Sequence, residues 1–175
     1  MNATRRRLLV ALFLLLPTLP AFAADADPAA PIAAIYKRIV ASLDTARRNT
    51  DNGAFIWLYD KNRRQYFSAR TAKLWRDADR LTPKGDQGPL GFDPVTNSQD
   101  PLVQSFDMAI EKRDATSATV AVHISDKPGS IVAPAAGGTI RYDMVLERGR
   151  WVIDDIRGTI DTEWSVRKIL RDYKG

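Results

Sequence analysis

Few side chains in this 175-residue sequence are suited to acid–base or covalent chemistry, because it contains one histidine and no cysteine. The lack of cysteine excludes cysteine nucleophiles, disulfides, thiolate metal sites and iron–sulfur clusters, and a single histidine excludes a multi-histidine metal centre. We therefore expect no metal ion and no cofactor. What remains is the chemistry of carboxylates, of one imidazole and of clustered arginines.

His123 and Asp155 are the candidates for a base and an acid. His123 is the one side chain whose ordinary pKa lies near neutrality, but strand alternation places it on the outer face, away from its apolar neighbours, and no orienting partner can be identified. Asp155 shares the parity of Trp151 and Ile153, which predicts an inward carboxylate. An inward carboxylate either serves a pocket with a raised pKa or pairs with an arginine or a backbone amide, and we favour the second role.

A second pair of carboxylates, Asp93 and Asp100, brackets the oxygen-bearing residues 96–98. Oxygen donors of this kind suit a hard cation or a paired-carboxylate site, although the spacing does not match a helix–loop–helix calcium motif. Asp-Pro and Asn-Ser pairs are also typical of turns whose side chains bond their own backbone. We therefore favour a loop anchor over a weak cation site.

Positive charge is concentrated early in the chain. Residues 31–80 carry 11 Lys or Arg against five acids, whereas residues 81–130 carry four against seven. A basic face on the predicted helices would meet anionic lipid head groups or an acidic partner, or would be a solvated face neutralised by the acidic segment, which we favour. The residues of this predicted face are Arg47, Arg48, Arg63, Arg64, Arg70 and Lys73.

The first 23 residues have the pattern of a secretory signal peptide: a basic head, an apolar run from Leu8 to Leu16 and the triplet Ala21-Phe22-Ala23. This apolar run has nine residues, whereas a membrane-spanning helix needs about 20, so we expect cleavage and a periplasmic or secreted protein. Adjacent arginines also loosely match a twin-arginine signal, but we favour the general secretory route. Cleavage after Ala23 removes three arginines and no acid, so the formal charge falls from +5 to +2 and nucleic acid is not an expected partner.

The remaining 152 residues have the composition of one globular domain, with 45% hydrophobic and 27% charged residues in the whole chain. We expect a disordered lead over residues 24–31 and a single domain over residues 32–173. Helical spacing of apolar residues predicts one helix from Ile32 to Ala46 and another from the N-cap Ser68 to Leu81. A loop rich in Gly and Pro follows.

From Leu102 the apolar period changes from 3.6 to 2, which indicates strands. We predict four strands, separated by turns or loops, and a closing helix from Thr162 to Tyr173. Helices followed by an antiparallel meander indicate an α+β fold with the N-terminal helices packed on a four-stranded sheet and a short C-terminal helix. The strands are expected at residues 102–111, 116–125, 140–146 and 151–157.

Three segments resemble the YbjP/YqhG-type bacterial envelope proteins of unknown function, over residues 32–173. The segments are Tyr66-Phe67-Ser68, residues 91–100 with the sequence Gly-Phe-Asp-Pro through Gln-Asp, and residues 149–156 with the sequence Gly-Arg-Trp-Val-Ile-Asp-Asp-Ile. The resemblance implies a fold of the nuclear transport factor 2-like (cystatin-like) superfamily, in which a curved sheet and helices form a cone with a pocket. Some members are lipoproteins, but this chain lacks the lipidated cysteine, so we expect no stable membrane anchor.

These observations favour an exported, non-catalytic binding or interaction module of the cell envelope, with an envelope protein as partner, a small ligand in the cone or peripheral contact with the membrane. Two alternatives stay open. One is a hydrolase, isomerase or dehydratase that uses Asp155 and His123 in the cone, and the other is an immunity protein against a cell-wall hydrolase. An enzyme needs two polar groups converging in a deep pocket, whereas an interaction module shows a shallow or filled cone and an exposed apolar patch.

Overall fold

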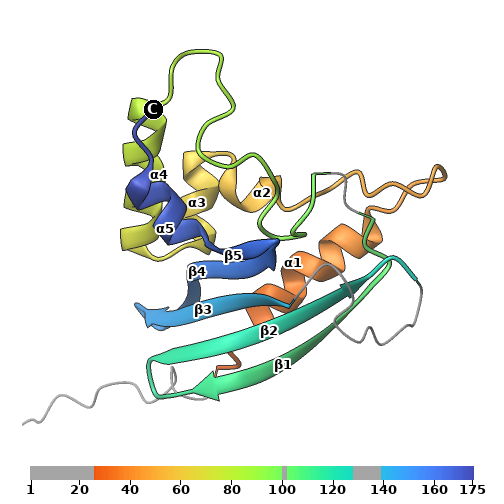
Figure 1. Ribbon diagram of the computed structural model, residues 1–175. Coiled ribbons are helices and arrows are strands. Elements are labelled where there is room, and N and C mark those ends of the chain that lie inside the picture. Colours follow the sequence, from red (N-terminus) through yellow and green to blue (C-terminus); the bar gives the residue numbers. More distant parts are fainter. Residues whose placement is uncertain (1–25, 100–101, 128–138) are drawn as a thin grey trace, which may run out of the picture.

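The computed structural model describes residues 26–99, 102–127 and 139–175 as an α+β fold around one antiparallel sheet (Figure 1). The predicted signal peptide and Asp100 lie outside the described residues. The sheet is a simple meander in which each strand pairs with the next along the chain. Its strands are β1 (Ser105–Arg113), β2 (Ser117–Ser125), β3 (Ile140–Glu147), β4 (Arg150–Ile160) and β5 (Thr162–Ser165).

The prediction of four strands was wrong, because residues 162–165 form a fifth strand instead of the first turn of a helix. Asp161 adopts a positive φ of 57° and reverses the chain, so that Trp164 comes to lie opposite Gly158 of β4. Ser165 then caps the last helix, α5 (Val166–Asp172), by accepting a hydrogen bond from the Lys168 amide. The helix therefore begins only after this cap.

Within residues 26–99, four helices precede the sheet: α1 (Ala30–Ala41), α2 (Ala54–Trp57), α3 (Asp60–Tyr66) and α4 (Ala69–Leu81). The predicted start of α4 is confirmed, because the Ser68 hydroxyl accepts a hydrogen bond from the Thr71 amide. α1 begins before Ile32, so the last two residues of the predicted lead are helical, and the preceding Ala29 is buried. Residues 24 and 25 of that lead lie outside the described residues. α1 lies against one face of the sheet, and α3, α4 and α5 gather beside β4 and β5 (Figure 1).

The core lies between α1 and the sheet face formed by alternate residues of β2, β3 and β4. Ile32, Ile35 and Ile39 of α1 are fully buried there, and each contributes about 1.5–3 kcal/mol relative to an exposed side chain. The two buried tyrosines of this core satisfy each other's polar ends. The Tyr36 hydroxyl donates to the Val95 carbonyl at 2.5 Å and lies 3.0 Å from the Tyr142 hydroxyl.

A β-bulge in β4 changes which side chains face the core. Asp143 of β3 pairs with Asp155, but the next residue, Met144, pairs with Ile153, so Asp154 is the inserted residue. One extra residue reverses the alternation beyond it. Asp155 therefore lies on the outer face, in register with Asp143, and the predicted inward position was wrong. The bulge also keeps Ile156 on the core face.

Candidate functional site

The two adjacent aspartates of the bulge hold the starts of two helices. Asp154 is 3% exposed, and its carboxylate accepts hydrogen bonds from Ser68 and Arg70 at the start of α4 and from Arg167 of α5. Burial disfavours the charged carboxylate, but the hydrogen bonds of Arg70 and Ser68 and the nearby charge of Arg167 outweigh it. The pKa of Asp154 therefore lies below its ordinary value.

Asp155 anchors α5. Its carboxylate accepts hydrogen bonds from the Ser165 hydroxyl at 2.6 Å, from the Arg167 amide at 3.0 Å and from the Ile156 amide at 2.9 Å. Burial raises the pKa of Asp155 above its ordinary value, and the bonds from Ser165 and Arg167 oppose that rise. Of the two roles considered from the sequence, these contacts are those of a carboxylate that caps a neighbouring backbone.

His123 and Asp155 are not brought together. His123 pairs with Asp107 of β1, and its Nδ1 atom is buried without a hydrogen-bond partner within the described residues. β3 separates β2 from β4, so the strands carrying the two side chains lie about 10 Å apart. Along β2, His123 is four residues, about 13 Å, beyond Thr119, which stands level with Asp143 and Asp155. The two groups cannot act on one substrate atom as base and acid.

Asp93 is a buried loop anchor. Its carboxylate accepts hydrogen bonds from the amides of Gly53 and Val95 and from the Trp57 indole. Burial raises the pKa of Asp93, and these hydrogen bonds oppose the rise. In the described ranges no group of three or more His, Asp or Glu side chains is placed to hold a metal ion, and Asp100 lies outside these ranges.

The residues of the predicted basic face do not form one surface. Arg63 is 4% exposed: its guanidinium lies 4.6 Å from the Trp75 ring and pairs with Asp79, so it belongs to the interior. Arg64 and Lys73 each pair with an aspartate on their own helix, and Arg70 pairs with Asp154. The first two residues of the face, at positions 47 and 48, are exposed in the segment between α1 and α2, which extends away from α4 (Figure 1).

A polar network that the sequence did not single out crosses the outer face of the sheet. Arg141 of β3 binds Glu111 of β1 through two hydrogen bonds of 2.8 Å. Arg157 of β4 binds Asp143 of β3 through hydrogen bonds of 2.7 and 2.8 Å, and Thr119 donates to the same carboxylate. Paired carboxylates fix the direction of both guanidinium forks before any ligand arrives.

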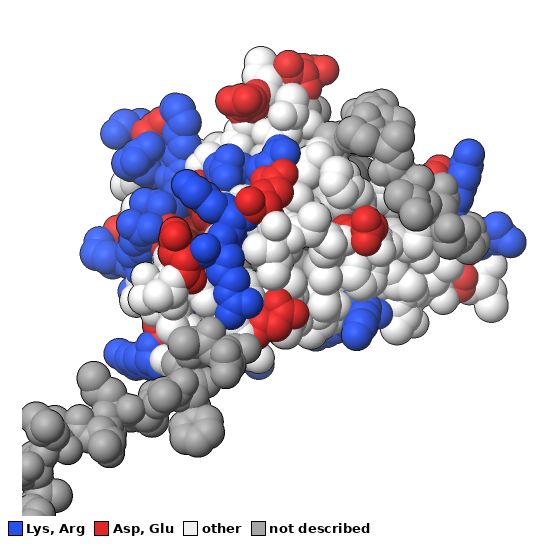
Figure 2. Space-filling model, turned by 90° about the horizontal axis from the view of Figure 1, so that it is seen from below, with Lys and Arg blue, Asp and Glu red and all other residues white. Residues whose placement is uncertain are grey.

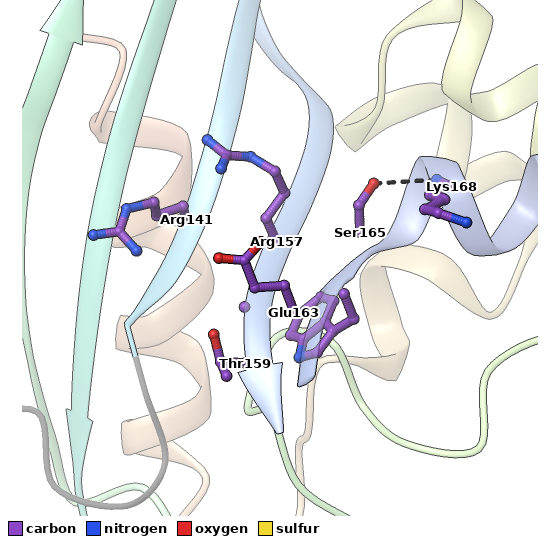
Figure 3. A pocket seen from close by; sticks show the side chains of 8 residues that line it. Arg141, Arg157, Thr159, Glu163, Ser165 and Lys168 are labelled. Atoms are coloured by element: carbon purple, nitrogen blue, oxygen red, sulfur yellow. Dashed lines mark hydrogen bonds between the residues drawn. The ribbon is translucent and has the colours of Figure 1, made fainter. Parts of the chain in front are cut away.

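The two arginines open into a cleft of about 330 Å³ at the β4–β5 edge, which is the candidate binding site (Figure 3). Figure 3 shows Arg141 and Arg157 reaching over the sheet from neighbouring strands, with Glu163 extending from β5 beside them. The cleft therefore combines three cationic side chains with one carboxylate. Its lining residues are Arg141, Arg157, Gly158, Thr159, Glu163, Trp164, Ser165 and Lys168.

The indole of Trp164 forms a fixed wall of this cleft. A Cβ atom on Gly158 would lie 2.5 Å from the indole ring, so only glycine lets the ring pack on β4. The Trp164 indole donates to the Asn97 side chain at 3.0 Å, and the Phe92 ring meets it edge-on at 4.9 Å between centroids. Asn97 in turn donates to the Thr159 carbonyl. The loop of residues 91–99 therefore supports the cleft.

The charged residues of the cleft could have been found only from the strand register. Arg141, Asp143 and Arg157 alternate with apolar residues, a pattern that any solvated sheet face shares. Their pairing depends on β3 and β4 meeting in the observed register, with the bulge between them. Glu163 was hidden because its segment was predicted to be helical.

Compared with known proteins, the chain matches no family model, no curated protein and no solved structure. The resemblance to the YbjP/YqhG-type proteins therefore stays a prediction. Among the described residues, every helix is too short or too polar to cross a bilayer.

Proposed function

We propose that the protein is an exported, non-catalytic binding module of the bacterial cell envelope, and that the cleft at the β4–β5 edge holds its ligand. Export is supported by the basic head, apolar run and Ala-Phe-Ala end of residues 1–23. The α+β order of helices and meander is compatible with a variant of the nuclear transport factor 2-like cone, which we propose on the motif resemblance.

The charge pattern of the cleft carries this proposal. Arg141, Arg157 and Lys168 line the cleft, and each is already paired with a carboxylate, those of Glu111, Asp143 and Asp172. Each guanidinium uses only its Nε–H and one Nη2–H in its pair, so its remaining N–H donors can bind a ligand carboxylate. Glu163 is exposed and, within the described chain, no ion pair engages it. The complement of this arrangement is a small molecule with at least two carboxylates and one ammonium group, an amino dicarboxylate. A cleft of about 330 Å³ accepts a ligand of that size.

The same contacts argue against catalysis in this cleft. Two hydroxyl side chains line it, those of Thr159 and Ser165, and the Ser165 hydroxyl donates to Asp155 and accepts from the Lys168 amide. Ser165 is therefore engaged as the N-cap of α5. His123 does not line the cleft. A nucleophile needs a base within hydrogen-bond reach.

Calorimetric titration tests the proposal. We expect L-glutamate and meso-diaminopimelate to bind the purified protein without being altered, and succinate, which lacks the amine, to bind more weakly. Arg157→Gln should weaken all three by about tenfold, since a hydrogen bond to a charged group contributes about 1.5–3 kcal/mol. Glu163→Gln should remove the preference for the amine-bearing probes while leaving succinate unchanged.

Lys73→Gln is the matched control, because Lys73 is exposed and paired on its own helix, away from the cleft. Absence of binding of all three probes at millimolar concentration by the folded protein would overturn the proposal. Equal binding of the probes by wild type and Arg157→Gln would do the same.

A further inference from the structure

A second hollow, of about 260 Å³, lies between the helices and the turn that joins β3 to β4. It belongs to the end of the molecule where Lys and Arg side chains gather (Figure 2). We call it the basic hollow. It is lined by Arg64, Phe67, Ala69, Ala72, Arg76, Glu147, Arg148 and Arg150.

The turn presents two of these arginines in a fixed way. Arg148 and Gly149 are the two residues between β3 and β4, and both have positive φ angles, 51° and 76°. Such a two-residue hairpin turn favours Asn-Gly, whereas arginine is disfavoured at the first position. Arg148 therefore has a backbone conformation that is unfavourable for arginine. Residues in such strained conformations cluster at functional sites.

Arg148 and Arg150 are also uncommitted. Across the described parts of the chain, neither guanidinium has an ion-pair partner, and both residues are exposed. Arg64 and Arg76 share one carboxylate, that of Asp60, at 2.5 Å and 3.7 Å.

The hollow therefore carries an excess of positive charge. Four guanidinium groups face two carboxylates: that of Asp60 and that of Glu147, which already accepts the first amide of α4, from Ala69, at 3.1 Å. The sum is +2. A phosphate monoester carries about −1.5 to −2 at pH 7, and its oxygens match the forks of several guanidinium groups at once.

We infer that the basic hollow is a binding site for a dianionic phosphate group, a phosphate monoester or a diphosphate, with Arg148 and Arg150 as its principal ligands. This site is separate from the cleft at the β4–β5 edge and does not depend on its function. Phe67 and Ala72 are buried behind it and give the anion an apolar floor. Such a floor strengthens charged hydrogen bonds.

Titration of the full-length mature protein with pyrophosphate tests the inference. Arg148→Asn is the decisive variant, because asparagine suits the turn and the variant should fold at least as well as wild type. We expect it to weaken pyrophosphate binding at least tenfold, and Arg150→Gln to do likewise. Binding by wild type should weaken as salt is raised.

Arg47→Asn provides a matched control. Arg47 is likewise an exposed arginine with a positive φ, 58°, but it lies in the segment between α1 and α2. It should leave pyrophosphate binding unchanged. No pyrophosphate binding by wild type, or the same loss in Arg47→Asn and Arg148→Asn, would overturn the inference.

Vesicles of phosphatidylcholine with and without phosphatidic acid identify the source of the phosphate. Binding that needs phosphatidic acid, is lost in Arg148→Asn and is competed by pyrophosphate assigns the site to a lipid head group. Pyrophosphate binding without vesicle binding assigns it to a soluble phosphate. Both outcomes support the inference.

Discussion

Two pairs of arginines at the same end of the molecule have opposite situations. Arg70 and Arg167 both bind the buried carboxylate of Asp154, whereas Arg148 and Arg150 face the basic hollow and have no ion-pair partner in the described chain. The residue type is the same in both pairs. A guanidinium that binds a buried carboxylate links a helix to the sheet. A guanidinium without such a partner can instead bind an anionic ligand.

The largest expected effect tests the bracing pair. Asp154→Ala removes the shared carboxylate and the bond to Ser68. Loss of one partner of a buried pair costs about 3–5 kcal/mol, and we expect about 3 kcal/mol because the Arg70 side chain is 59% exposed and stays solvated. Urea unfolding measures the change.

Arg150→Ala is the contrasting variant, and its unfolding free energy should stay within about 0.5 kcal/mol of wild type. If the two variants were equally destabilised, the distinction between bracing and ligand-binding arginines would fail.

A smaller effect separates the two neighbouring aspartates by pH. The folded-state pKa of Asp154 is lowered, so its stabilisation is complete above the ordinary carboxyl pKa, about 3.9, and is lost as the pH falls through the lowered value. The folded-state pKa of Asp155 is raised, so as the pH falls the native protein takes up this proton before the unfolded chain does. The contribution of Asp155 to the free energy of unfolding therefore rises as the pH falls through the raised value.

The pH dependence of the free energy of unfolding should therefore change in opposite directions in the two variants. Asp154→Asn should flatten the loss of stability in acid, and Asp155→Asn should steepen it. Profiles of equal slope in the two variants would contradict the assignment.

The smallest expected effect concerns the basic hollow. Arg148→Asn relieves the left-handed backbone cost of arginine, so we expect the free energy of unfolding to rise by about 1 kcal/mol. For a chain of this size that corresponds to about 2–4 °C in the melting temperature, which calorimetry resolves. A fall in stability would mean that Arg148 acts as a brace after all.

The apolar patterns of the sequence predicted the elements better than their contacts. Alternation of apolar residues located β1 to β4 within a few residues, and the N-cap residue Ser68 located the start of α4. Both signals come from residues that are close together in the sequence. Asp161, whose positive φ turns the chain into β5, carries no comparable local signal. The bulge at Asp154 was also not predicted, and the partners of its carboxylate, Ser68, Arg70 and Arg167, are not neighbours of Asp154 in the sequence.

The candidate sites were less predictable for the same reason. Arg63 counted as a surface charge until its contacts with Trp75 and Asp79 placed it inside. The outward alternation of Arg141 and Arg157 is visible in the sequence, but their partners are known only from the register. A connection between the predicted strands 140–146 and 151–157 was expected, yet the closeness of that turn to α3 and α4 was not.

The bulge in β4 also couples the local unfolding of α4 to that of α5. The hydrogen bond from Ser68 to Asp154 links positions 86 residues apart, and Arg167 bridges Asp154 through its side chain and Asp155 through its amide. Neither helix can detach from the sheet without disturbing the same pair of carboxylates. The two helices therefore form one cooperative unit of local opening, which amide hydrogen exchange would register as similar protection in both.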